Sequence, residues 1–127
     1  MIFLECSQVI FINQIVVEKF GGLSGLRDGG LLDSAIANPK NLYLYNPSCG
    51  IFNLAASYCI SIIKNHAFLD GNKRTAFTSM DVFLSLNNVV LNFPEVETVD
   101  KMVEIATNNL HIKELALWLQ SLTYLPK

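Results

Sequence analysis

The most apolar long segment of the sequence is Ile51-Phe-Asn-Leu-Ala-Ala-Ser-Tyr-Cys-Ile-Ser-Ile-Ile-Lys64. Drawn as a helix, it carries apolar side chains on almost every side. A helix with this pattern is surrounded by other helices, because a helix that faces water keeps one polar side. We therefore predict that these residues form the central helix of an all-α domain.

Amphipathic segments on both sides of this stretch predict the surrounding helices, since their apolar residues recur at helical spacing. Before it, we expect a helix over Cys6–Phe20 that ends at Gly21-Gly22, and another that follows the N-cap Asp28 and stops before Pro39. After it, we expect helices from Gly71-Asn72 to about Asn87, from Pro94 with an apolar face of Val96, Val99, Met102, Val103 and Ala106, and from Ile112 to Leu122. The prediction is a compact bundle of about six helices that forms a single domain over residues 1–127.

The segment Lys40–Gly50 departs from this pattern. Asn41-Leu-Tyr-Leu-Tyr45 suits an extended segment better than a helix, and Asn46-Pro47-Ser48 is typical of a turn. We predict a short flap or hairpin here.

The composition excludes a disordered chain. Apolar residues make up 51% of the chain and charged residues 16%, and disorder requires the opposite balance. So few charges fit either an apolar surface that a partner covers or a dense helical core. The sequence leaves both interpretations open.

The charge argues against direct binding of nucleic acid. The formal net charge is −2, with nine Lys and Arg against eleven Asp and Glu. A protein that binds nucleic acid needs a basic face to displace counterions from phosphate.

We expect a cytoplasmic protein that does not enter the membrane. Cys6, Cys49 and Cys59 include no Cys-x-x-Cys pair, which fits a reducing compartment. Met1–Glu5 lacks the basic region of a signal peptide. No apolar run approaches the roughly 20 residues that a membrane span requires.

The polar stretch Asn65-His-Ala-Phe-Leu-Asp-Gly-Asn-Lys-Arg-Thr75 carries the candidate chemistry. Gly71 and Asn72 open a helix, whose free backbone N–H groups and dipole suit a phosphate group. Lys73 and Arg74 add two positive charges at the same place.

Two further residues of this stretch could act on a bound phosphate. Asp70 offers a hard oxygen ligand for Mg²⁺, which usually takes one or two protein carboxylates together with water and nucleotide phosphates. His66 could act as a general base. Each signal has a plain alternative: a structural histidine, an N-cap aspartate and a solvated basic helix face. The spacing of a Walker A loop is absent, so the residues alone indicate a phosphate site with a base beside it.

The stretch His66-Ala-Phe-Leu-Asp-Gly-Asn-Lys-Arg74 resembles the signature of the Fic/Doc superfamily, His-x-Phe-x-[Asp/Glu]-Gly-Asn followed by Gly-Arg or Lys-Arg. Upstream, Leu26-Arg-Asp-Gly-Gly-Leu-Leu-Asp-Ser-Ala35 resembles a segment of the death-on-curing (Doc) branch. The order of the predicted helices and a last helix that carries Trp118 also agree with this superfamily. The resemblance implies a Fic/Doc-like fold over most of the chain and an enzyme that uses ATP and Mg²⁺.

Two positions favour the Doc branch. Fic proteins typically transfer AMP from ATP to a protein hydroxyl, whereas Doc is similar in fold but phosphorylates a threonine of elongation factor Tu. Lys73 stands where AMP-transferring motifs have Gly, and Phe77 stands where they have a second Arg for the terminal phosphates. A phenyl ring cannot replace a bidentate guanidinium, so the resemblance implies a protein kinase.

The resemblance also implies a role for each site residue. His66 would take the proton from the target hydroxyl, and Asp70 would hold Mg²⁺. The backbone near Gly71 and Asn72, with the side chains of Asn72, Lys73 and Arg74, would cradle the phosphoryl group, and Lys73 is counted with His66 and Asp70 as catalytic. Outside this set we expect a core role for Phe68, a capping or surface role for His111, and a flap at Tyr43–Tyr45 that pairs with an extended target peptide.

The function so implied is that of a toxin in a type II toxin–antitoxin pair. It would phosphorylate a translation factor similar to elongation factor Tu and block translation, and a small Phd-like antitoxin would be its partner. The alternatives are a Fic-type AMP transferase, which Lys73 and Phe77 disfavour, and a catalytically inactive binding module. The joint presence of His66, Asp70, Asn72 and Lys73 disfavours the second alternative.

Overall fold

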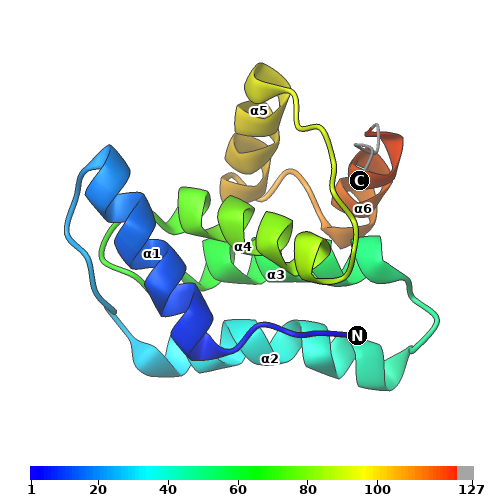
Figure 1. The fold of residues 1–127 in the computed structure, drawn as a ribbon, viewed down its shortest axis with the longest axis horizontal. Helices are drawn as coiled ribbons and strands as arrows, with labels where there is room; N and C mark the ends of the chain where they lie inside the picture. The colour runs from blue at the N-terminus through cyan, green and yellow to red at the C-terminus, as the bar shows by residue number, and fades with distance from the viewer. Residues whose placement is uncertain (123–127) are drawn as a thin grey trace.

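The structure is a computed structural model, in which residues 1–122 of the 127-residue chain are described. This part is all-helical, as predicted, and contains no strand beyond one isolated β-bridge (Figure 1). Its six helices are α1 (Cys6–Phe20), α2 (Gly29–Tyr45), α3 (Ile51–Asn65), α4 (Asn72–Leu86), α5 (Glu95–Ala106) and α6 (Ile112–Ser121). None of these helices combines the length and the apolar character needed to cross a bilayer.

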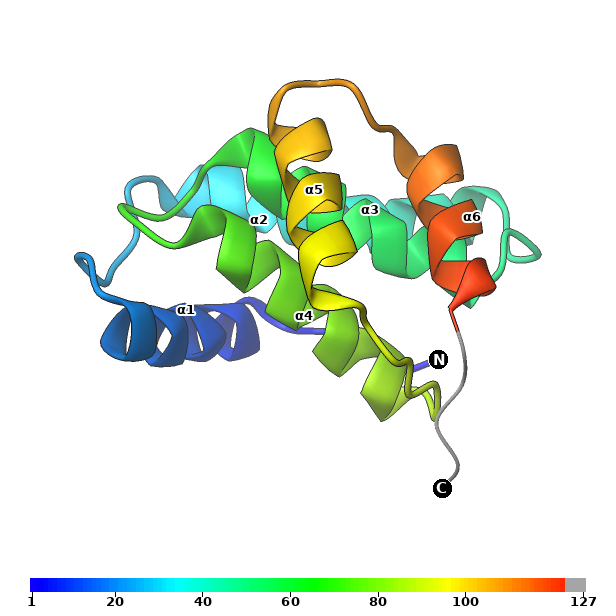
Figure 2. The same cartoon turned by 90° about the horizontal axis from the view of Figure 1, so that it is seen from above.

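Helix α3 is the central helix, as predicted. Every residue from Leu54 to Ile63 is buried. Helix α2 runs along one side of α3, while the shorter α5 and α6 pack on the opposite side and α4 lies alongside it (Figures 1 and 2). This arrangement follows from the apolar side chains on all faces of the segment, which lose contact with water only if neighbours cover every face.

Helix α2 is longer than the sequence predicted. Its N-terminus is as expected, since the carboxylate of Asp28 accepts a hydrogen bond from the backbone N–H of Leu31 at 3.0 Å. It does not stop before Pro39, however, but continues through this residue to Tyr45. Pro39 is itself buried, and Leu42 beyond it packs against the core, so burial outweighs the hydrogen bond that proline cannot donate.

The predicted flap or hairpin over Lys40–Gly50 is therefore wrong, and so is the strand-forming role given to Tyr43–Tyr45. Tyr43 packs edge-on against Phe3, with ring centroids 5.6 Å apart, and this contact holds the segment as helix. The predicted turn is present, because the N–H of Cys49 donates to the carbonyl of Asn46 at 3.0 Å.

Helix α5 faces the core with a different side from the one predicted. Thr98, Met102 and Ile105 are its buried residues. Val96, Val99 and Val103 are exposed instead of forming the inward face. The helix therefore presents apolar side chains to solvent next to α4.

Tyr58 on α3 connects the N-terminal segment to the core. Its side chain is fully buried, and its hydroxyl accepts a hydrogen bond from the backbone N–H of Leu4 at 2.9 Å. Burial raises the pKa of Tyr58 to about 12. The phenol therefore stays neutral and keeps this bond across the physiological range.

Replacement of Tyr58 by Phe is expected to lower the free energy of unfolding by about 1–3 kcal/mol, because the buried N–H of Leu4 loses its acceptor. Tyr45→Phe is the matched control, since Tyr45 is 90% exposed and should change stability very little. Urea denaturation of the two variants and the wild type measures the difference. Equal stabilities for the Tyr58→Phe and Tyr45→Phe proteins would show that the Leu4 bond contributes nothing.

Candidate active site

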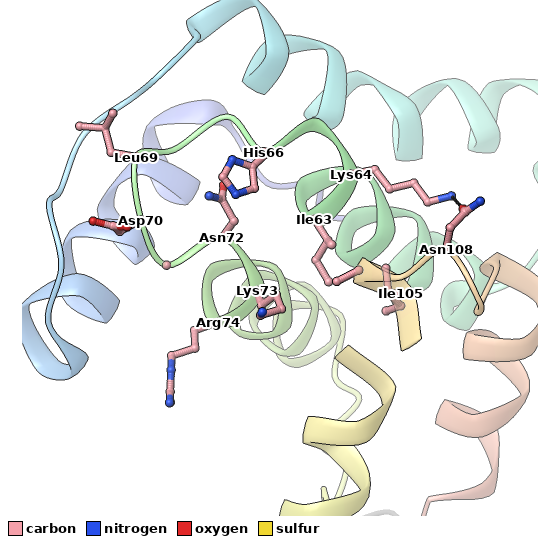
Figure 3. Close-up of a pocket in the computed structure, with 12 residues that line it drawn as sticks. Ile63, Lys64, His66, Leu69, Asp70, Asn72, Lys73, Arg74, Ile105 and Asn108 are labelled. Atoms are coloured by element: carbon pink, nitrogen blue, oxygen red, sulfur yellow. Dashed lines mark hydrogen bonds between the residues drawn. The ribbon is translucent and has the colours of Figure 1, made fainter. Parts of the chain in front are cut away.

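The residues predicted to carry the chemistry lie in and after the loop between α3 and α4 (Figure 3). His66 ends α3 in the left-handed conformation, with φ of 49°, a region that histidine visits more readily than most residues. Gly71 is the N-cap of α4 and also has a positive φ, 76°. Two left-handed residues thus reverse the chain between two helices that are both anchored in the core.

Asn72 fixes the shape of this loop. Its side-chain carbonyl accepts from the backbone N–H of Phe68 at 3.1 Å, and its side-chain amide donates to the carbonyl of Phe68 at 3.0 Å. Asn72 is buried and Phe68 is fully buried, as expected for its core role. One amide hydrogen of the Asn72 side chain and its backbone N–H then remain for the predicted contact with phosphate.

Helix α1 supports the loop from the other side. The buried side-chain amide of Asn13 donates to the carbonyl of Asp70 at 2.9 Å and to the hydroxyl of Thr75 at 3.1 Å. A Cβ at Gly71 would lie 3.3 Å from both Val16 and Val17. The sequence reasoning missed Asn13, although a polar residue on the apolar face of the first predicted helix was a usable signal.

The extended segment before α2 holds the start of the loop. The guanidinium Nε of Arg27 donates to the carbonyl of His66 at 2.9 Å. The backbone N–H groups of Arg27 and Asp28 donate to Ala67, and that of Leu69 donates to Gly25. Arg27 was not predicted as a site residue, yet it fixes the backbone that carries His66.

The first turn of α4 offers a site for an anion. No side chain caps this end of the helix, so the backbone N–H groups of Asn72, Lys73 and Arg74 are available to a ligand. Free N–H groups at a helix start, together with the helix dipole, bind phosphate or carboxylate groups.

An open pocket of about 790 Å³ lies at this helix end, bounded by the end of α3, the loop and the end of α5. His66 and Lys73 are both exposed side chains on its wall (Figure 3). Across the pocket the Lys64 ammonium donates to the side chain of Asn108 at 2.6 Å. The structure therefore brings together His66, Lys73 and the uncapped helix end.

Arg74 and Asp70 border the same pocket, but their charged groups point elsewhere. The guanidinium of Arg74 stacks 3.8 Å from the ring centroid of Phe20, so contact with a phosphate requires another rotamer. One carboxylate oxygen of Asp70 accepts from the backbone N–H of Leu23 at 2.7 Å, and the side chain points toward that segment (Figure 3).

Asp70 can bind Mg²⁺ only if a nucleotide supplies further oxygen ligands. Among residues 1–122, no three His, Cys, Asp or Glu side chains form a cluster that could hold a metal ion. Magnesium does not need one, because one or two carboxylates and nucleotide phosphates commonly complete its shell. The second oxygen of the exposed Asp70 carboxylate suits that role.

The sequence profile of the Fic/DOC family matches residues 3–84, more than half of the chain. The chain belongs to the Fic/DOC family.

Two curated relatives are similar over most of their length. "Toxin Doc" of Mycolicibacterium smegmatis is 38% identical over 100 residues, which cover 76% of this chain and 77% of the relative. "Protein kinase doc" of Escherichia phage P1 is 30% identical over 109 residues, which cover 86% of each chain. Both matches confirm the resemblance seen in the sequence.

Phe77 departs from the Fic/DOC pattern of the AMP-transferring members and has a structural role here. Its ring packs edge-on against Phe93, with ring centroids 4.9 Å apart. The ring of Phe93 in turn packs against that of Trp118, with centroids 6.1 Å apart. The position that would carry a phosphate-binding arginine is thus part of an aromatic cluster.

We expect Gly71→Ala to lower the free energy of unfolding by about 1–3 kcal/mol, since a side chain in the left-handed region costs about 1–2 kcal/mol and the new methyl crowds Val16 and Val17. Asn88→Ala is the control: Asn88 has φ of 68° on the exposed surface and should show only the smaller cost of the backbone conformation. Thermal and urea denaturation compare the two. A larger loss for Asn88→Ala would contradict the proposed support of the loop by α1.

Proposed function

We propose that this protein is a toxin kinase that transfers the γ-phosphate of ATP to a hydroxyl side chain of a translation factor similar to elongation factor Tu. The observation that carries the proposal is the uncapped start of α4, which opens with Lys73 into the same pocket as His66. A phosphate bound there lies next to a base. The names of the two relatives, a Doc toxin and a Doc protein kinase, support the same conclusion.

His66 takes the proton of the target hydroxyl in this proposal. The oxygen then attacks the γ-phosphorus, the bond to the oxygen that bridges the β- and γ-phosphates breaks, and ADP leaves. Negative charge spreads over the γ-phosphoryl oxygens during transfer, and its stabilisation is most of the catalysis. The N–H groups of Asn72 and Lys73 and the Lys73 ammonium supply that stabilisation.

Asp70 holds Mg²⁺ in this proposal, through the carboxylate oxygen that does not bind Leu23. When bound, the ion neutralises charge on the nucleotide phosphates. Because the Leu23 bond turns the Asp70 carboxylate away from the pocket, this side chain must change rotamer to bring that oxygen to the phosphates. Arg74 reaches the phosphates after leaving the ring of Phe20.

Phe77 and Lys73 favour phosphate transfer over AMP transfer. An AMP transferase places the α-phosphate beside the base, and the β- and γ-phosphates then extend along α4. In this protein the aromatic ring of Phe77 lies on that path. A triphosphate placed against apolar groups loses hydration without gaining partners.

The biological setting follows from the same proposal. The enzyme acts in the cytoplasm, blocks translation, and is neutralised by a small Phd-like antitoxin encoded with it. The exposed apolar side chains of α1 and α5 fit a protein that spends time bound to a partner.

Label transfer tests the proposal. Purified protein without antitoxin is mixed with elongation factor Tu, Mg²⁺ and ATP labelled at either the γ- or the α-phosphate. We expect label on the factor from γ-labelled ATP alone. The His66→Ala variant should be slower by about 10²–10⁴-fold, the usual cost of losing a general base.

His111→Ala is the matched control, because His111 is exposed at the start of α6, outside the pocket, and should keep full activity. Label from the α-phosphate would assign AMP transfer instead. Wild-type activity of the His66→Ala protein would refute the role of His66 as the base.

A further inference from the structure

One short segment at the end of α1 holds two charged side chains of the candidate site outside the pocket. The guanidinium carbon of Arg74 lies 3.8 Å from the ring centroid of Phe20, the last residue of α1. A carboxylate oxygen of Asp70 accepts a hydrogen bond from the backbone N–H of Leu23 at 2.7 Å. Residues 20–23 therefore contact the charged ends of both side chains.

Two glycines bring this segment against the loop between α3 and α4. Gly21 and Gly22 have φ of 91° and 112°, a region that residues with a side chain rarely adopt. The backbone of Gly22 lies directly on Asp70, because a Cβ at Gly22 would be 2.9 Å from the Cβ of Asp70. Further along, the carbonyl of Gly25 accepts from the N–H of Leu69 at 3.0 Å. The segment thus follows the loop closely.

The charged ends of Asp70 and Arg74 point out of the pocket that their residues border. In Figure 3 the Asp70 carboxylate points toward the pale blue chain that follows α1, and the Arg74 guanidinium points away from His66. Within residues 1–122 neither group forms an ion pair. Lys73 is then the charged side chain of the first turn of α4 that remains free for a phosphate.

We propose that residues 20–23 form an autoinhibitory latch, an inference that rests on the proposed kinase function. The latch holds Asp70 and Arg74 away from the phosphates until a polyphosphate with Mg²⁺ competes for them. Arg74 must leave an aromatic ring, and Asp70 must leave a backbone N–H. The free energy of each contact is subtracted from that of ligand binding, so the latch sets the ligand concentration at which the site becomes complete.

Both contacts are weak enough for such a ligand to break. Phe20 is 53% exposed and Arg74 is also exposed. A cation over an exposed ring changes an equilibrium constant by about two- to fivefold. The Leu23 bond has a charged acceptor, which makes it roughly twice as strong as a neutral hydrogen bond. Phosphate oxygens offer Arg74 a stronger partner than the ring, and Mg²⁺ offers Asp70 a stronger partner than an N–H group.

A purely structural role for the Phe20–Arg74 contact predicts a different result. If the ring only supported the end of α1, its removal would lower stability and would leave phosphate binding unchanged or weaker. The latch predicts tighter phosphate binding instead, because Arg74 no longer has to leave the ring. The sign of the change in affinity therefore separates the two roles.

Replacement of Phe20 by Leu removes the ring and keeps an apolar side chain. We expect this variant to bind inorganic tripolyphosphate with Mg²⁺ about two- to fivefold more tightly than the wild type, as measured by isothermal titration calorimetry. Phe11→Leu is the matched control, because Phe11 is 60% exposed and lies more than two turns earlier on the same helix. It should bind tripolyphosphate like the wild type. Unchanged or weaker binding by Phe20→Leu would overturn the latch.

The Arg74→Gln variant tests whether the gain passes through Arg74. This variant has lost the guanidinium that the ring holds, so adding Phe20→Leu should bring no further gain in tripolyphosphate affinity. Such a double-mutant cycle isolates the coupling between the two side chains. A gain of the same size with and without the guanidinium would show that Phe20 acts by another route, and would overturn the proposal.

NMR signals of the two held groups report the latch directly. Ring currents shift protons over an aromatic face upfield, so the Arg74 side-chain protons should be upfield in the wild type and ordinary in Phe20→Leu. The short bond to a carboxylate should shift the Leu23 amide proton downfield in the wild type but not in Asp70→Ala. At saturation with tripolyphosphate and Mg²⁺, both wild-type signals should move toward the values of these variants.

These measurements require no transfer reaction, so they separate the latch from the kinase function. Signals of Arg74 or of Leu23 that stay unchanged at saturation would overturn the latch, since the group would still be held with ligand bound. Tighter tripolyphosphate binding by Phe20→Leu in a protein that transfers no phosphate would leave the latch standing and remove the kinase function. Transfer of γ-label by a protein whose affinity Phe20→Leu does not change would do the reverse.

Discussion

Helix α3 is buried on nearly every side, and its packing sets the positions of the helices around it. An uninterrupted buried run from Leu54 to Ile63 needs helices around it, and it fixes the place where the chain leaves the core at His66. Helix α4 returns along α3 and is itself anchored by buried residues such as Met80 and Phe83. The loop between them is short and held at both ends, so its residues keep their positions without help from a ligand.

The loop between α3 and α4 positions the candidate catalytic side chains. The two hydrogen bonds between Asn72 and Phe68, and those that Asn13 donates to Asp70 and Thr75, hold the backbone of the loop. His66 and Lys73 stay exposed. Polar side chains that satisfy the backbone are thus separate from those that face the pocket. Such a division suits catalysis by positioning and charge stabilisation, in which the groups that meet the phosphate must be in place beforehand.

Much of this was predictable from the sequence, because helical periodicity and the signature motif are local patterns. They gave the all-helical fold, the central helix and the loop. The extension of α2 through Pro39 could not be predicted, since it depends on the burial of Pro39 and Leu42 against other helices. The contacts of Asn13 with Asp70 and of Arg27 with His66 span 57 and 39 residues, and only the fold brings them together. Val96, Val99 and Val103 of α5 are exposed. An apolar stripe on a helix therefore does not show by itself which residues of that helix face the core.

In the proposed kinase, the start of α4 binds the nucleotide phosphates beside His66. Backbone amide chemical shifts of ¹⁵N-labelled protein, recorded during titration with a non-hydrolysable ATP analogue and Mg²⁺, test it most directly. We expect the amides of Asn72, Lys73 and Arg74 to show the largest changes and the imidazole signals of His66 to change at the same ligand concentrations. Saturable binding that leaves these three amides unchanged would contradict it.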